Sequence, residues 1–153
     1  MNDTIHVRDM RIIGLIGAKG AGKTTAYNII GDMVLTNEIM IARKLKTVCA
    51  DVLCIPEEMF ADPIIKERPF EMAHILTTID LGYILRKFNL LGHLPMVIAK
   101  HNGTVLLSPR HAAQYIGTEI LRDIDHRVHV RGAISGIDTG RFNVVTEDRK
   151  SVV

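Results

Sequence analysis

A chain of 153 residues with 47% hydrophobic and 24% charged residues has the size and balance of one globular domain. Its net charge of +2, with no isolated Lys/Arg cluster, argues against a nucleic-acid polymer as partner. No apolar run approaches the roughly 20 residues that cross a bilayer, and residues 1–6 do not resemble a signal peptide, so we expect a cytoplasmic protein with no membrane partner.

The first predicted element is a short apolar run, residues 11–16, of the kind that forms a buried parallel strand. Residues 17–24, GAKGAGKT, then match G-x-x-x-x-G-K-[ST] without mismatch, and residues 25–30 have helical spacing. In this order of strand, loop and helix, glycines let backbone N–H groups surround phosphate oxygens at the positive end of the helix dipole. A turn that merely joins strand to helix is the weaker alternative. The predicted binding residues are Gly17, Lys19, Gly20, Ala21, Gly22, Lys23, Thr24 and Thr25.

Two residues of this loop have more particular roles. Lys23 is predicted to reach the outer phosphates as a point charge, and the Thr24 hydroxyl is predicted to hold Mg²⁺. The helix that follows should end near Gly31. Residues 33–41 are compatible with either a helical end or a second strand.

Residues 42–53 predict a helix, because their apolar side chains form one stripe and their basic side chains lie elsewhere. The stripe consists of Leu45, Val48, Cys49, Val52 and Leu53. Pro56 followed by two glutamates indicates another helix start. Polar, proline-interrupted residues 61–74 predict a mobile excursion from the sheet.

Residues 75–92 carry apolar residues at mixed helical spacing, and residues 97–107 predict a hairpin or loop around His101-Asn102-Gly103. The apolar residues of the first stretch are Ile79, Leu81, Ile84, Leu85 and Phe88. Further on, a helix is expected over about 125–135, and residues 142–146 predict a strand that enters the sheet late.

Ser108-Pro109 predicts the start of a helix, with a capping residue followed by Pro at the first helical position. On this helix Arg110, Gln114 and Gly117 would share one face, which Arg122 extends. A guanidinium could grip a phosphate through two hydrogen bonds, and a carboxamide could read a base edge. Considered alone, an exposed helix with solvated charges is equally compatible with the pattern.

The histidines and cysteines do not indicate a metal centre. Cys49 and Cys54 lack C-x-x-C or Cys/His spacing, and we expect two free thiols in a reducing compartment. The histidines show no ligand spacing either, and His129 is expected to be structural or exposed.

Taken together, these segments resemble the phage-type deoxynucleoside monophosphate kinases, a branch of the P-loop nucleotide kinases. The resemblance covers about residues 11–146 and includes the phosphate loop, residues 45–46, 50–53 and 55–60, and the segment from Ser108 to Arg122. That last segment reads S-P-R-x-x-x-Q-x-x-G-T-E-x-x-R, which is far more particular than the loop.

The resemblance implies an α/β three-layer P-loop kinase fold, with a mostly parallel sheet and a helical acceptor-binding insertion at about 42–107. It also implies an enzyme that uses ATP and Mg²⁺ to phosphorylate a deoxynucleoside 5′-monophosphate, in the host cytoplasm if the origin is viral. Lys23 and Arg110 would be catalytic. The acceptor would be bound by Lys46, Arg110, Gln114, Gly117, Thr118 and Arg122. Residues 61–74, with Lys66 and Arg68, are either a surface loop or a segment that closes over substrates.

Two departures from the family pattern stand out. His129 occupies a position where the family commonly has Trp, which puts base preference in doubt. Residues 148–153, DRKSVV, are what the sequencing adapter GATCGGAAGAGCGTCGTG encodes, so we expect a non-native tail and a chain cut before the family's lid. A P-loop kinase of another small molecule and a nucleotide-binding module without turnover stay open as alternatives, as does a homodimer.

Overall fold

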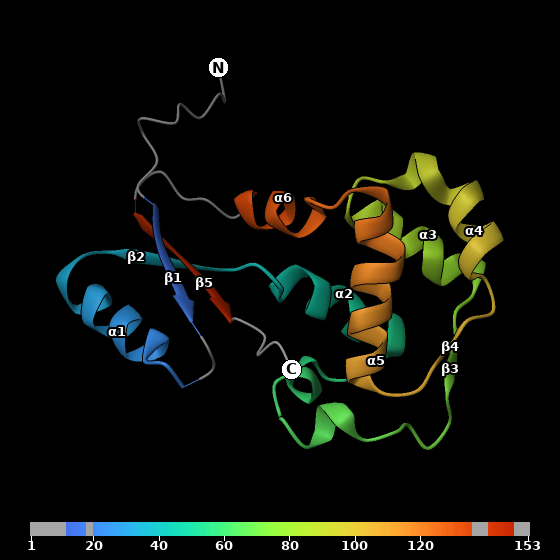
Figure 1. Ribbon diagram of the computed structural model, residues 1–153, viewed down its shortest axis with the longest axis horizontal. Coiled ribbons are helices and arrows are strands. Elements are labelled where there is room, and N and C mark those ends of the chain that lie inside the picture. The colour runs from blue at the N-terminus through green and yellow to red at the C-terminus, as the bar shows by residue number, and fades with distance from the viewer. Residues whose placement is uncertain (1–11, 18–19, 136–140, 149–153) are drawn as a thin grey trace. The chain divides into compact units, whose positions relative to one another are not determined.

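The computed structural model describes residues 12–17, 20–135 and 141–148 as a mixed α/β protein (Figure 1). Its contacts divide the chain into two compact units. The discontinuous unit combines Met1–Ala42 with Val130–Val153, and the continuous unit is Arg43–His129. The continuous unit extends further along the chain than the predicted insertion at about 42–107. Assignment of both units to one domain stays a prediction.

The described part of the discontinuous unit contains a parallel three-stranded sheet, the helix that follows the glycine-rich loop and most of the last helix of the chain. The elements are β1 (Ile12–Gly17), α1 (Lys23–Met33), β2 (Thr36–Met40) and β5 (Phe142–Asp148). The strand order is β1-β5-β2, with Ile12 opposite Asn143 and Thr36 opposite Phe142. The expected strand late in the chain is therefore confirmed, and it lies at the centre of the sheet.

The expectation that β1 is a buried strand is wrong. Its side chains alternate between exposed and half-buried, and Ile12 and Ile16 are 50% and 62% exposed. Because successive side chains point to opposite faces of a sheet, one face of β1 is covered and the other is open. Burial in this sheet centres on Ile39 and β5, where Val144 and Asn143 are fully buried.

The continuous unit is mostly helical and contains a short antiparallel hairpin, β3 with β4. Its first elements are α2 (Arg43–Leu53), η2 (Glu57–Phe60), η3 (Ile65–Glu67), β3 (His74–Ile75) and α3 (Thr78–Lys87). They are followed by η4 (Leu91–His93), α4 (Leu94–His101), β4 (Val105–Leu106), α5 (Pro109–Gln114), η5 (Tyr115–Arg122) and α6 (Val128–Ile134). The last helix crosses the boundary between the units.

The core of the continuous unit confirms the predicted apolar stripe of α2. Val48, Cys49, Val52 and Leu53 are buried in it, and Leu45 packs against it. In α3, Leu81, Ile84 and Leu85 are fully buried. Ile79, which the sequence placed with them, is 82% exposed.

The hairpin or loop predicted over residues 97–107 is wrong for its first half, which is helical. Pro95 stands in the first turn of α4, and Val97 and His101 are buried. The burial of Val97 and His101 on one face of this helix outweighs the local turn signal of the residues that follow it. The turn itself is present, because Gly103 has a φ of +84°.

Residues 61–74 form a folded connection rather than an open excursion. The Asp62 carboxylate accepts hydrogen bonds from the backbone N–H groups of Ile64 and Ile65, at 2.8 and 3.1 Å. η3 then contacts α5, and the Phe70 N–H donates to the Leu107 carbonyl at 2.8 Å.

Candidate nucleotide and acceptor sites

The glycine-rich loop joins β1 to α1 as the sequence predicted. Gly20 and Gly22 have φ values of +85° and +98°, a region that side chains rarely adopt. At Gly17 an added Cβ would lie 3.2 Å from the Ala21 Cβ, so the loop also turns tightly there. The predicted Lys19 lies outside the described residues. The glycines thus have the backbone conformation and close approach that a phosphate loop needs.

Lys23 reaches back across this loop. Its Nζ donates a hydrogen bond to the Gly17 carbonyl at 2.6 Å, which places the ammonium group at the carboxyl end of β1. Thr24 and Thr25 follow in the first turn of α1 and are exposed.

The loop offers one protein ligand of the kind that Mg²⁺ takes beside a nucleotide. In such sites Mg²⁺ is bound by the loop's Ser or Thr hydroxyl together with a carboxylate, phosphates and water, and the exposed Thr24 supplies such a hydroxyl. In the part of the chain that the structure describes, no group of three or more His, Cys, Asp or Glu side chains is placed to hold a metal ion.

The second candidate site is built on α5. Ser108 is extended at the N-cap position, and its Oγ accepts a hydrogen bond from the His111 N–H at 3.1 Å. Pro109 then occupies the first helical position, which confirms the predicted helix start. This cap fixes where the helix begins, and Arg110 and Gln114 follow one turn apart.

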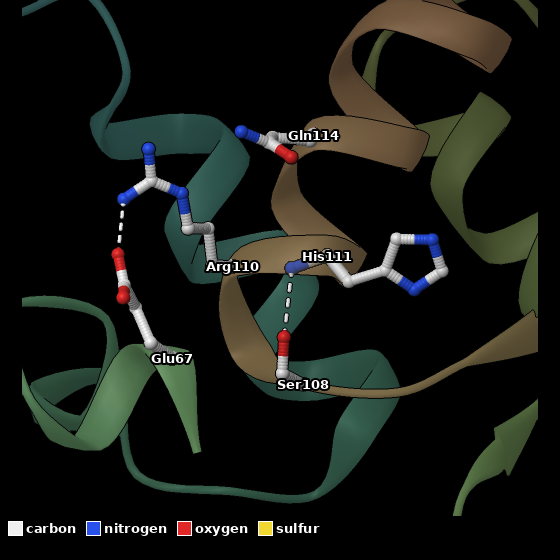
Figure 2. A pocket seen from close by; sticks show the side chains of 5 residues that line it. All are labelled: Glu67, Ser108, Arg110, His111 and Gln114. Carbon is white, nitrogen blue, oxygen red and sulfur yellow. Dashed lines mark hydrogen bonds and ion pairs between the residues drawn. The ribbon is translucent and has the colours of Figure 1, made fainter. Parts of the chain in front are cut away.

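A cavity of about 320 Å³ lies beside the start of α5. Its lining residues are Glu67, Ser108, Arg110, His111 and Gln114. Figure 2 shows the Arg110 guanidinium and the Gln114 carboxamide extending to the same side, whereas the His111 ring points away from them. The structure therefore brings together the cation and the carboxamide that the sequence assigned to the acceptor.

Arg110 is already paired in this cavity. Its Nη1 contacts Glu67 Oε1 at 2.6 Å, and the two side chains are 48% and 57% exposed. Glu67 comes from η3, 43 positions earlier in the chain, and was not predicted as a site residue. Lys66 and Arg68, the basic residues of the segment expected to be either a surface loop or a closing segment, do not line the cavity.

The remaining predicted acceptor residues lie elsewhere in the continuous unit. Gly117 is buried, and its carbonyl accepts a hydrogen bond from His129 Nε2 at 3.1 Å. Thr118 and Arg122 are exposed, Lys46 is half-buried, and none of these residues lines the cavity. Arg110 and Gln114 thus line the cavity together, whereas Gly117 lies in η5, a π-helix, to which the α-helical spacing used in the prediction does not apply. The roles of these four residues, Lys46, Gly117, Thr118 and Arg122, in acceptor binding stay predictions.

Two buried histidines, His101 and His129, have pKa values below the ordinary value. Burial lowers the pKa of His129, opposed by its hydrogen bond to Gly117 and assisted by the Arg122 charge. Its Nδ1 is buried without a partner. Burial also lowers the pKa of His101, whose Nδ1 lies 2.7 Å from the Tyr115 hydroxyl. Both imidazoles are buried and hydrogen-bonded within the continuous unit, and a structural role for His129 stays a prediction.

Comparisons of the sequence with models of protein families and with curated proteins give no match. Within the described residues, no helix combines the length and apolar character that a membrane crossing requires.

Proposed function

We propose that this protein is a P-loop kinase that transfers the γ-phosphoryl group of ATP to the 5′-phosphate of a deoxynucleoside monophosphate. The observation that carries the proposal is the loop from Gly17 to Thr24. It combines the complete motif with two left-handed glycines and a lysine folded over the loop. Such a loop binds the phosphates of a nucleotide through backbone N–H groups and a point charge.

The cavity beside α5 supports the choice of acceptor. A guanidinium and a carboxamide one turn apart suit a ligand with a phosphate at one end and a polar base edge at the other. These residues belong to the S-P-R-x-x-x-Q segment, on which the resemblance to deoxynucleoside monophosphate kinases mainly rests.

Phosphoryl transfer demands little covalent chemistry from the protein. Lys23 would neutralise charge on the outer phosphates of ATP. The Thr24 hydroxyl would contribute one ligand to Mg²⁺, which would supply further charge neutralisation at the phosphates. Arg110 would bind the acceptor phosphate and offset the repulsion between the two anionic nucleotides. The products are ADP and a deoxynucleoside diphosphate.

The test is ADP release from Mg-ATP in the presence of dGMP, dTMP, dCMP or dAMP. Arg110→Ala should lower kcat/KM for the best acceptor at least about 100-fold, because a charge-assisted phosphate contact is lost. Lys100→Ala is the matched control, since Lys100 is a 54%-exposed cation paired with Asp123 outside the cavity. ATP binding without acceptor-dependent release would contradict the proposal and favour a nucleotide-binding module.

A further inference from the structure

The carboxylate of Glu67 contacts one nitrogen of the Arg110 guanidinium, the group that we assign to the ligand's phosphate. We propose that Glu67 sets the affinity and charge preference of the cavity by competing with the ligand's phosphate for the Arg110 guanidinium. This inference rests on the proposed function, because it takes the cavity to be the acceptor site. It adds a specificity-determining residue that the sequence did not indicate.

The position of Glu67 is fixed by its own segment. The Asp62 carboxylate caps the turn that leads into η3, and the Glu67 N–H donates to the Ile64 carbonyl at 3.3 Å. η3 in turn packs against α5. The carboxylate is thus presented to Arg110 by a structured turn, and Figure 2 shows it directed toward the guanidinium.

The contact is nevertheless easily exchanged. Both side chains are about half exposed, and an exposed ion pair is worth less than about a five-fold factor in an equilibrium. Guanidinium binds carboxylate and phosphate through the same planar array of donors. A phosphate dianion has more charge and more acceptor oxygens than Glu67, and so displaces it. A singly charged carboxylate ligand has no such advantage.

Charge balance leads to the same conclusion. With Glu67 in place, the pair has no net charge, and an approaching anion is attracted by Arg110 but repelled by the adjacent carboxylate. Removal of the negative charge at position 67 should therefore strengthen phosphate binding. If Glu67 instead served to hold the guanidinium in place for the ligand, its removal would weaken phosphate binding.

The experiment is an NMR titration of the full chain with inorganic phosphate at pH 8 and, separately, with dGMP and deoxyguanosine, following the backbone amide resonances of α5, which remain in every variant. Glu67→Gln should lower the dissociation constants for phosphate and dGMP about three- to five-fold. The constant for deoxyguanosine, which lacks the phosphate, should not change. Glu67→Ala should shift the constants in the same direction, and Arg110→Ala should abolish phosphate binding.

Asp123→Asn is the matched control. Asp123 is 53% exposed, pairs with Lys100 at 3.5 Å and does not line the cavity, so this variant changes the net charge equally. It should change phosphate affinity less than about two-fold. Unchanged or weaker phosphate binding in both Glu67 variants, or equal tightening in Asp123→Asn, would overturn the inference.

The two proposals fail in different ways. If phosphate binds more tightly in Glu67→Gln but none of the four deoxynucleotides supports ADP release, the competition holds and the kinase proposal is wrong. If ADP release depends on Arg110 but the Glu67 variants do not tighten phosphate binding, the kinase proposal holds and this inference is wrong.

Discussion

Gly117 lies where a helix backbone comes close to its neighbours. A Cβ at this position would stand 2.7 Å from Leu45 Cδ2 and 3.5 Å from His129 Nε2. Gly117→Ala should therefore destabilise the fold by about 1–3 kcal/mol, because the surrounding side chains must move. Urea unfolding would measure the difference.

Gly82 in α3 is the matched control for Gly117. An added Cβ there meets nothing within 4 Å, and the position is also helical. Gly82→Ala should stabilise the protein by about 0.5–1 kcal/mol through lower chain entropy and better helix propensity. Equal effects of the two substitutions would contradict the close packing at Gly117.

His129 should make stability depend on pH. Burial lowers its pKa below the ordinary 6.5, so the unfolded chain binds the proton more tightly than the folded one. This stabilising contribution is complete above about pH 6.5 and is lost as pH falls from there through the folded pKa. His101 acts in the same direction.

The free energy of unfolding, measured in urea between pH 7.5 and pH 5, should therefore decrease toward acid. His129→Gln retains a donor for the Gly117 carbonyl but cannot titrate, and should make this dependence shallower. A wild-type profile that is flat or rises toward acid would contradict the assignment.

The pairing of Glu67 with Arg110 could not be predicted from residue patterns alone. Lys66-Glu67-Arg68 is an ordinary charged run in a polar stretch, and its sequence contains nothing that points to Arg110. The pairing results from the packing of η3 on α5. Arg110 and Gln114 were predictable, because a cap and a helical period place them one turn apart.

Among the helices, α3 has the most complete cap. The Thr77 Oγ1 accepts from the Asp80 N–H at 3.2 Å, and an Asp80 carboxylate oxygen accepts from the Thr77 N–H at 3.1 Å. The same carboxylate oxygen lies 2.9 Å from His74 Nε2. Thr77→Ala should cost about 1 kcal/mol of stability, because two backbone N–H groups depend on this arrangement.

Thr78→Ala provides the comparison for this cap. Thr78 is the first residue of α3 and is exposed, so its substitution should change stability by less than about 0.5 kcal/mol. Thermal unfolding of both variants would show the difference, and a Thr78 effect as large as that of Thr77 would mean that the cap is not the cause.

Helix starts were predictable where the signal is local, as at Ser108-Pro109 and Pro56. The π-helical geometry of η5 was not, because it accompanies a packing arrangement in which Gly117 contacts Leu45 and His129. α4 was missed for a related reason. Its burial against the core outweighed the turn residues at its end.

The large apolar cluster found among the described residues lies entirely within Arg43–His129. A fragment of residues 43–129 should therefore fold cooperatively without the parallel sheet, since its core is self-contained. Urea unfolding followed by circular dichroism would test this, with Leu81→Ala in the fragment expected to cost about 2–5 kcal/mol. A gradual, non-cooperative transition would show that the core needs the discontinuous unit.

The parallel sheet itself was predictable in class. Apolar runs at residues 11–16 and 142–146 and the loop motif indicated parallel strands with helical connections. The division into two units could not be predicted, because local periodicity does not indicate which helices pack into the same core. Nor did the sequence indicate Asn143, a fully buried amide whose Oδ1 accepts from Asn37 Nδ2 at 3.1 Å.

The central place of β5 has a consequence for synthesis on the ribosome. β1 and β2 pair with β5 and not with each other, so the sheet cannot assemble until residues 142–148 have emerged. The continuous unit, which emerges earlier, can collapse around its own core while the glycine-rich loop still lacks its supporting sheet. The nascent chain should therefore form the cavity beside α5 before the glycine-rich loop has the sheet that supports it.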